Sequence, residues 1–329
     1  MTSYEALADK ALAGEPLTRE EALGVLRCDD ADLPALLAAT WRVRRRFHGN
    51  TVKVHVLMNA KRGGCAEDCG FCVQAADGAV EPYRLQEADE ILREAREAHA
   101  RGAWKFCIVT ATRGPSERDL DTVCEAVRQI KKTVPIRICA SLGLLTPEKA
   151  ARLAEAGVDR FNHNLESSER FFPEVCSTHT WRDRVRTLRT AKAAGMELCS
   201  GGIVGMGETD EDVVDLALAV RELDVDSIPV NFMMPVREGA PRPAAPLTPA
   251  YALKVLCLTR LLNPSKDIRA AAGRELHLRA LQPMALYAAN SIFTDGYLNT
   301  PGQGISQDMA MIRDLGFVTV QVPEHAGAA

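Results

Sequence analysis

The sequence lacks any run of about 18 uncharged apolar residues, so it offers no candidate for a membrane-spanning helix. Its 23 glycines and 17 prolines are too few for collagen-like repeats or extended disorder. The formal net charge of −4, with a pI near 6.0, gives no support for a broadly basic nucleic-acid-binding surface. The 329 residues are therefore expected to form a globular protein that binds neither nucleic acid nor membrane.

The N-terminal residues 1–26 also lack the basic segment and apolar stretch of a secretory signal, and their acidic residues argue against a mitochondrial transit peptide. We therefore expect a cytoplasmic protein, whose thiols remain reduced. Under those conditions, the ten cysteines are expected to be metal ligands, catalytic groups or small buried side chains rather than disulfides.

Residues 1–50 are predicted to form an N-terminal helical extension, with helices at Glu20–Leu26 and Leu33–Phe47. Thr18 and Glu21 form a candidate capping box for the first of these helices. The second helix ends in the basic run 42–46, which we interpret as a solvated face rather than a phosphate-binding patch.

From residue 53, short apolar runs rich in β-branched residues alternate with amphipathic helical stretches. The predicted strands are Lys53–Met58, Phe106–Ala111, Ile136–Ala140, Arg160–Asn164, Glu197–Ile203, Ser227–Phe232, Asp267–Ala270 and Ala288–Ile292. The predicted helices are Ala88–Ala100, Glu117–Lys132, Pro147–Ala156, Thr180–Ala194, Glu211–Leu223, Pro249–Leu262, Arg274–Gln282 and Gln303–Leu315. The proline-rich residues 235–249 are expected to form a long loop.

Alternating strands and helices imply parallel strands joined by right-handed crossovers. Eight such units fit a closed α/β fold, the (β/α)₈ TIM-type barrel, which we assign to residues 51–329 as one domain. An open doubly wound sheet is the alternative, but the sequence lacks its Gly-x-Gly-x-x-Gly fingerprint after the first strand.

The loop after the first predicted strand carries Cys65, Cys69 and Cys72 in the spacing C-x₃-C-x₂-C. Three thiolates on one loop can hold three corners of a 4Fe–4S cubane and leave one iron open to a small-molecule chelator. The position agrees, because barrel active sites lie on the loops that follow the strands. A zinc site completed by a distant residue is the alternative, since no fourth ligand lies nearby in sequence.

Polar or sulfur-containing residues also recur along the later predicted strands. They are Cys107, Cys139, Asn162, Asn164, Cys199, Asn231 and Arg269. Barrel interiors are normally apolar layers, and a buried guanidinium needs a negatively charged partner. Three thiolates and Arg269 could therefore hold a second, smaller iron–sulfur cluster, although a lone cysteine on a strand is usually a small buried side chain. We apply that simpler interpretation to Cys28, Cys124, Cys176 and Cys257.

The cysteine spacing, with Phe71 before the last cysteine, resembles the radical S-adenosylmethionine (radical SAM) superfamily. In that superfamily SAM chelates the open iron, and its cleavage yields methionine and a 5′-deoxyadenosyl radical. Within the superfamily, motifs from residue 59 to about 293 resemble the biotin synthases. The matching motifs include Asn59-Ala-Lys, Cys139-Ala-Ser-Leu-Gly, Asn162-His-Asn-Leu, Cys199-Ser-Gly-Gly-Ile-Val-Gly-Met-Gly-Glu-Thr, Ile228-Pro-Val-Asn-Phe and Arg269-Ala-Ala-Ala-Gly-Arg-Glu.

This resemblance implies two clusters and a substrate site. Cys65, Cys69 and Cys72 would ligate the 4Fe–4S cluster, whereas Cys107, Cys139, Cys199 and Arg269 would ligate a sulfur-donating 2Fe–2S cluster. SAM and the substrate's ureido ring would be held by Asn164, Glu166, Arg184, Gly201, Gly202 and Asn231. The implied substrate is dethiobiotin, the electron donor a flavodoxin or ferredoxin, and the assembly a homodimer.

The chain departs from the family's usual pattern at Arg62, Ala66 and Glu166, where a small residue, proline and aspartate are common. Strand alternation predicts that His163 points away from Asn162 and Asn164, in a structural role. Glu67 and Asp68 are expected to be solvated.

Two other functions stay open at this point. One is a radical SAM enzyme with another substrate, such as a hydrogenase-maturase-like or amino-acid-mutase-like relative. The other is a non-catalytic zinc or iron–sulfur protein. The set Cys107, Cys139, Cys199 and Arg269 favours the sulfur-inserting function, because the other radical SAM relatives need not carry it.

Overall fold

The computed structural model describes residues 3–78, 80–234, 240–243, 246–296 and 302–321. Its strands are β1 (Thr51–Lys61), β2 (Lys105–Thr110), β3 (Arg137–Ser141), β4 (Arg160–Asn162), β5 (Glu197–Cys199), β6 (Gly202–Val204), β7 (Ser227–Phe232), β8 (Asp267–Ala270), β9 (Ser291–Phe293) and β10 (Val318–Thr319). Its α-helices are α1 (Tyr4–Ala13), α2 (Arg19–Leu26), α3 (Leu33–His48), α4 (Ala88–Ala100), α5 (Glu117–Thr133), α6 (Pro147–Ala156), α7 (Trp181–Ala193), α8 (Asp210–Glu222), α9 (Pro249–Leu262), α10 (Arg274–Leu278) and α11 (Ile305–Asp314).

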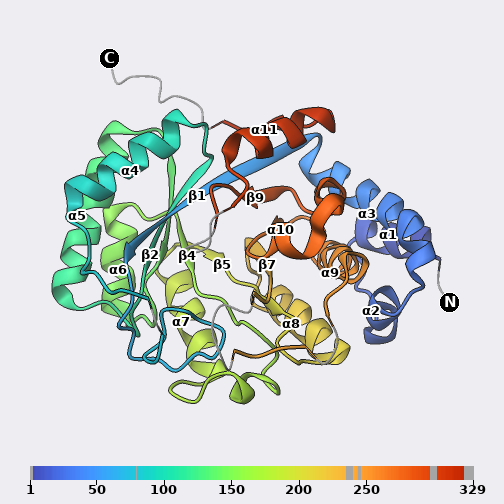
Figure 1. The fold of residues 1–329 in the computed structure, drawn as a ribbon, viewed down its shortest axis with the longest axis horizontal. Coiled ribbons are helices and arrows are strands. Elements are labelled where there is room, and N and C mark those ends of the chain that lie inside the picture. The colour runs from blue at the N-terminus through green and yellow to red at the C-terminus, as the bar shows by residue number, and fades with distance from the viewer. Residues whose placement is uncertain (1–2, 79, 235–239, 244–245, 297–301, 322–329) are drawn as a thin grey trace.

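The strands form a closed parallel barrel with helices around it (Figure 1). The order is β1-β2-β3-β4-β5-β7-β8-β9, and the pairing of β1 with β9 at Lys53 and Ser291 closes the ring. Strands β5 and β6 follow each other along the chain and both pair with β7, so together they occupy one position of the barrel. The predicted (β/α)₈ barrel is confirmed.

Several predicted elements match the structure residue for residue, including α4, α6, α9, β7 and β8. Other predictions were wrong in detail. The fifth predicted strand is interrupted at Ser200 and Gly201, and the predicted helix Arg274–Gln282 ends early as α10 and continues as a 3₁₀ helix, Arg279–Tyr287. A positive φ of 50° at Arg279 and the ring of Pro283 explain that change, because neither suits a continuing α-helix.

The predicted capping box of α2 is present. Thr18 Oγ accepts a hydrogen bond from the Glu21 amide at 3.1 Å, and Glu21 Oε2 accepts one from the Thr18 amide at 2.9 Å. These bonds satisfy amides that a helix N-terminus leaves unpaired.

Arg44 corrects the expectation that the basic run 42–46 is a solvated face. Arg42, Arg45 and Arg46 are exposed, whereas Arg44 is fully buried. Its guanidinium lies 4.7 Å from the ring of Phe317 and donates hydrogen bonds to main-chain oxygens, including that of Ala289 at 3.3 Å. Arg44 lies seven residues after the buried Leu37, and therefore on the same inward face of α3.

Within the described residues, no helix is both long enough and apolar enough to cross a membrane. The predicted loop 235–249 lies partly outside the described residues.

Candidate active site

The loop between β1 and α4 turns back on itself and brings its three cysteines to one cavity. The Cys65 amide donates to the Gln74 carbonyl at 3.2 Å, and the Cys72 amide donates to the Cys69 carbonyl at 3.0 Å. Cys65, Cys69 and Cys72 all border a cavity of about 240 Å³. The open side of this thiol group therefore faces a space in which a small molecule can bind.

Arg62, for which the sequence offered no explanation, stabilises the returning part of this loop. Its Nε donates to the Glu81 carbonyl at 2.8 Å, and its guanidinium lies 4.7 Å from the ring centre of Tyr83. The main chains of Arg62 and Tyr83 also form an antiparallel bridge.

The cavity lies at the C-terminal ends of the barrel strands, as expected for a (β/α)₈ enzyme. Residues at or just beyond the ends of successive strands border it, among them Thr110, Ser141, Asn162, Asn164, Ile203 and Asn231. His163 borders it too, although it lies between Asn162 and Asn164 in the chain. Strand β4 ends at Asn162, and the alternation of side chains ends with it.

Arg184 connects the cysteine loop with the wall of the cavity. It lies in the first turn of α7, which begins at a capping box formed by Thr180 and Asp183. Its Nη1 donates to the Asn164 carbonyl at 2.7 Å, and its Nη2 lies 3.8 Å from Cys69 Sγ. This buried cation is therefore placed at the edge of the three-cysteine group.

Asn164 and Asn231 belong to the polar part of the cavity wall. Asn164 Oδ1 accepts a hydrogen bond from the Gly201 amide at 3.3 Å, and Asn231 Nδ2 donates to the Gly202 carbonyl at 3.0 Å. A Cβ at Gly201 would lie 1.9 Å from the Pro229 carbonyl oxygen, and one at Gly202 would lie 2.3 Å from that of Glu166. Both positions therefore require glycine.

Glu166 is buried beside Arg184, with 3.7 Å between Oε1 and Nη1. Burial raises the pKa of this carboxyl, although the positive charge of Arg184 opposes the shift. Its backbone adopts a φ of 69°, and its second carboxyl oxygen has no hydrogen-bond partner among the described residues. The structure thus brings all six predicted SAM and substrate residues to one region.

Cys107, Cys139 and Cys199 form a second, deeper group of buried thiols. Cys107 and Cys139 occupy paired positions of β2 and β3, and Cys199 packs with them. Val109 and Ser141, which border the cavity, each lie two residues beyond one of these cysteines. The thiols therefore lie about 7 Å below the cavity along the strands.

Arg269 completes this deeper group. Its Nη1 lies 3.8 Å from Cys199 Sγ, and its Nη2 donates to Ser227 Oγ at 3.0 Å. Its Nε is buried without a hydrogen-bond partner among the described residues. The structure therefore brings together all four residues predicted to hold the smaller cluster.

The three deeper thiols differ in pKa. The neighbouring Cys139 thiol lowers the pKa of Cys107 against the effect of burial, and Arg269 lowers it further. The pKa of Cys139 is instead raised to about 12, and that of Cys199 is also raised. Beneath the thiols, burial and the neighbouring Arg160 lower the pKa of Lys105 to about 8.

Two acidic residues of the cysteine loop correct the prediction that they are solvated. Glu67 is buried, and its Oε2 lies 2.8 Å from His179 Nδ1. Asp68 accepts hydrogen bonds from the amides of Ser177 and Thr178, at 3.0 and 3.2 Å. Together they anchor the segment that leads into α7.

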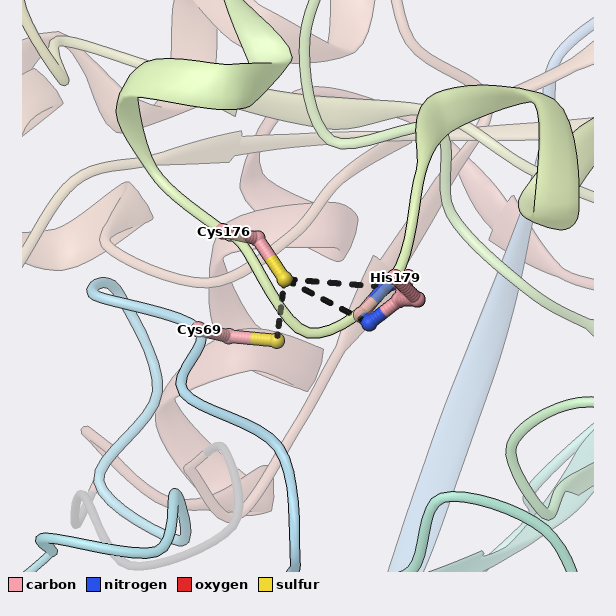
Figure 2. Close-up of side chains that lie close together, drawn as sticks. All are labelled: Cys69, Cys176 and His179. Atoms are coloured by element: carbon pink, nitrogen blue, oxygen red, sulfur yellow. Dashed lines mark hydrogen bonds between the residues drawn. The ribbon is translucent and has the colours of Figure 1, made fainter.

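Cys176 and His179, which the sequence analysis did not select as site residues, lie beside Cys69 (Figure 2). Cys176 is buried, as predicted, but its Sγ lies 3.7 Å from Cys69 Sγ and 3.3 Å from His179 Nδ1. The spacing Cys-x₂-His was a signal for this pair, since it is common among metal ligands.

Comparisons with known proteins agree with this geometry. Residues 62–220 match the model of the radical SAM superfamily, and residues 229–318 match that of the biotin and thiamin synthesis associated domain. The barrel, its cysteine loop and the cavity beside that loop thus define a radical SAM enzyme, a class that uses a 4Fe–4S cluster and SAM.

The chain is 52% identical to the biotin synthase of Salinibacter ruber over 98% of its own length and 91% of that relative's. It is 49% identical to the biotin synthase of Geobacillus kaustophilus over 96% of each chain. The chain belongs to the biotin synthase family.

Solved structures show the same fold at lower identity. A methylornithine synthase superposes with a TM-score of 0.83 at 21% identity, covering 96% of this chain and 97% of the other. An FeFe-hydrogenase maturase from Carboxydothermus hydrogenoformans superposes with a TM-score of 0.82 at 16% identity, covering 97% of this chain and 79% of the other. These two similarities concern the fold alone.

Proposed function

We propose that the chain is a sulfurtransferase that converts dethiobiotin to biotin. The observation that carries this proposal is the deeper group of Cys107, Cys139, Cys199 and Arg269 beneath the cavity. The names of the similar biotin synthases support it. A radical SAM enzyme that does not insert sulfur has no evident need for three thiols and a guanidinium at this depth.

The residues present fit both clusters. Cys65, Cys69 and Cys72 would hold three irons of a 4Fe–4S cluster, and the adjoining cavity leaves the fourth iron accessible. A 2Fe–2S cluster would be held by Cys107, Cys139, Cys199 and Arg269. The Nε of Arg269 has no hydrogen-bond partner among the described residues, so it is available to the cluster. When bound, these groups with SAM supply a 5′-deoxyadenosyl radical for hydrogen abstraction and the sulfur atom for insertion.

The chain's own residues bind and orient the reactants. The Arg184 guanidinium is suited to the methionine carboxylate of SAM, because a guanidinium can donate two parallel hydrogen bonds to a carboxylate. Asn164, Glu166 and Asn231 offer amide and carboxyl groups to the ribose of SAM and to the ureido ring. The main chain of Gly201 and Gly202 would pack against SAM.

The barrel would also separate the reaction from water. The cavity lies above the deeper thiols, whose surroundings include Leu57 and Phe293. A substrate bound in the cavity would therefore present its unactivated carbons toward the sulfur source in a site from which solvent is excluded.

The proposal extends to partners and organisation. We assign a helical extension to residues 1–50 and the barrel domain to residues 51–329. A homodimer, a flavodoxin or ferredoxin as electron donor and a cytoplasmic location complete the proposal.

An anaerobic assay tests the activity. The protein is reconstituted with iron and sulfide, supplied with SAM, dethiobiotin and a reductant, and its products are followed by mass spectrometry. We expect biotin and two molecules of 5′-deoxyadenosine per biotin, because two C–H bonds must be broken. Formation of 5′-deoxyadenosine without biotin, in protein that holds both clusters, would contradict the assigned substrate. Absence of both products in such protein would contradict the cluster assignments.

A further inference from the structure

Cys69, Cys176 and His179 converge from two segments, the cysteine loop and the residues that precede α7 (Figure 2). All three side chains are buried, and one ligand atom from each lies within 4.8 Å of the other two. The clusters proposed above use Cys69 but leave Cys176 and His179 without a function.

We propose that the chain, before it receives its clusters, binds one thiophilic divalent cation such as Zn²⁺ through Cys69 Sγ, Cys176 Sγ and His179 Nε2. Tetrahedral zinc, with bonds of about 2.3 Å to sulfur and about 2.0 Å to nitrogen, separates two sulfur ligands by about 3.8 Å and a sulfur from a nitrogen by about 3.5 Å. The two sulfur atoms lie 3.7 Å apart, and Cys176 Sγ lies 3.3 and 3.9 Å from the two ring nitrogens of His179. The two sulfur atoms thus already have the spacing that the metal requires. The imidazole would have to turn, because Cys176 Sγ lies nearer to Nδ1 than to Nε2.

Glu67 prepares the imidazole for this role. Its Oε2 lies 2.8 Å from His179 Nδ1, so a proton on Nδ1 is held by the carboxylate and the lone pair of Nε2 is left for a metal. In the present structure Nε2 accepts a hydrogen bond from Arg184 Nε at 3.0 Å. The cation would replace that bond, so the Arg184 guanidinium would have to withdraw from the imidazole when the ion binds.

Charge and access both suit a divalent ion. Two thiolates neutralise its charge, and Asp68 adds a carboxylate 3.3 Å from Cys176 Sγ. Arg113 pairs with Glu67 at 3.0 Å, which limits the excess of negative charge around the site. Cys69 and His179 border the cavity, so water can reach the fourth coordination position.

Cys69 would belong both to this site and to the proposed 4Fe–4S cluster. The cation and the assembled cluster would therefore exclude each other, and loading of the cluster would require displacement of the ion. Only this consequence rests on the proposed function, since the cation site stands on the three side chains alone.

Cobalt provides the test, because tetrahedral thiolate complexes of Co²⁺ absorb visible light. Full-length cluster-free protein is titrated with Co²⁺ under anaerobic, thiol-reducing conditions. We expect one equivalent to bind to the wild type and at least tenfold weaker binding in Cys176→Ser and His179→Ala. Cys72→Ser is the matched control, because Cys72 lies on the same loop but outside the site, and its binding should equal that of the wild type.

The opposite pattern would overturn the proposal. If Cys65→Ser and Cys72→Ser weaken binding while Cys176→Ser and His179→Ala titrate as the wild type, the ion occupies the loop cysteines instead. X-ray absorption of the zinc-loaded wild type identifies the ligands of the ion directly, even if a variant fails to fold. Two sulfur ligands and an imidazole nitrogen support the site, and three sulfur ligands without imidazole refute it.

Discussion

Cys107 and Cys139 lie directly opposite each other on the paired strands β2 and β3, and β3 lies between β2 and β5, the strand that carries Cys199. Cys139 is therefore the central member of the deeper thiol group. The parallel register places these side chains on the same side of the sheet, toward the barrel interior. Its central position makes Cys139 the most informative thiol to replace.

We expect Cys139→Ser to lower biotin formation at least tenfold while part of the 5′-deoxyadenosine formation persists. The substitution disturbs the deeper thiols and leaves the cysteine loop unchanged. Mass spectrometry measures the amounts of biotin and of 5′-deoxyadenosine that each variant forms. Cys124→Ser is the control, because Cys124 is a buried cysteine on α5 outside both thiol groups and should retain both products. Equal loss of biotin in the two variants would contradict the role given to the deeper thiols.

We expect Arg184→Ala to weaken SAM binding by about tenfold to 100-fold, the loss that removal of a charged hydrogen-bonding partner typically causes. Equilibrium dialysis of the reconstituted protein measures the affinity under anaerobic conditions. Arg182→Ala is the matched control two residues away, because that side chain is 81% exposed and pairs with Glu169 at the surface. Unchanged affinity in a folded Arg184→Ala protein would remove this residue from the SAM site.

Gly202→Ala is expected to lower the thermal unfolding midpoint, because it should lower the free energy of unfolding by at least about 2 kcal/mol. The added methyl group would lie 2.3 Å from the Glu166 carbonyl oxygen and 2.6 Å from a methyl carbon of Leu216. Gly24→Ala in α2 is the control, because no atom lies within 4 Å of its added Cβ. That control should be neutral or stabilise the protein by about 0.5–1 kcal/mol. A Gly202→Ala protein as stable as the wild type would show that β6 can shift.

Asp212 should make stability depend on pH below about 4. Burial opposes ionisation, but Arg170, Ser168 and the Thr209 amide hold the pKa of Asp212 at about 2, below its ordinary value of 3.8. The ionised carboxylate therefore stabilises the fold above about pH 4, and this contribution is lost as the pH falls toward 2.

The effect can be measured by comparing Asp212→Asn with the wild type. We expect the substitution to cost about 1–2 kcal/mol near neutral pH, a value reduced from the full pKa shift because Arg170 is mostly exposed. In urea unfolding, the difference between the two proteins should shrink between pH 4 and pH 3. A difference that stays constant over that range would show that the Asp212 carboxylate does not couple to folding in this way.

The barrel could be predicted because its signals are local and repeated. Each strand is a short β-branched run and each helix carries an apolar face, so both periods can be recognised without knowledge of distant contacts. The cysteine loop could be predicted equally well, since its three thiols lie within a stretch of eight residues. Placing Cys107, Cys139 and Cys199 together needed one further inference, that parallel strands bring corresponding positions to the same level.

The errors arose where distant segments pack together. Glu67 and Asp68 looked solvated because acidic loop residues usually are, yet they bind a segment about 110 residues further along the chain. Arg44 looked like one more exposed arginine, but the Phe317 ring and the Ala289 carbonyl, which help to bury it, come from the C-terminal part of the chain.

The sequence by itself thus determined the barrel, the cysteine loop and the residues that line the barrel interior, because periodicity and spacing are properties of neighbouring residues. The tertiary structure alone decided that Arg184 contacts both Asn164 and Cys69, that Glu67 binds His179, and that Cys176 lies beside Cys69. These contacts depend on how the cysteine loop packs against the segment before α7, and no local pattern encodes the contact between two irregular segments.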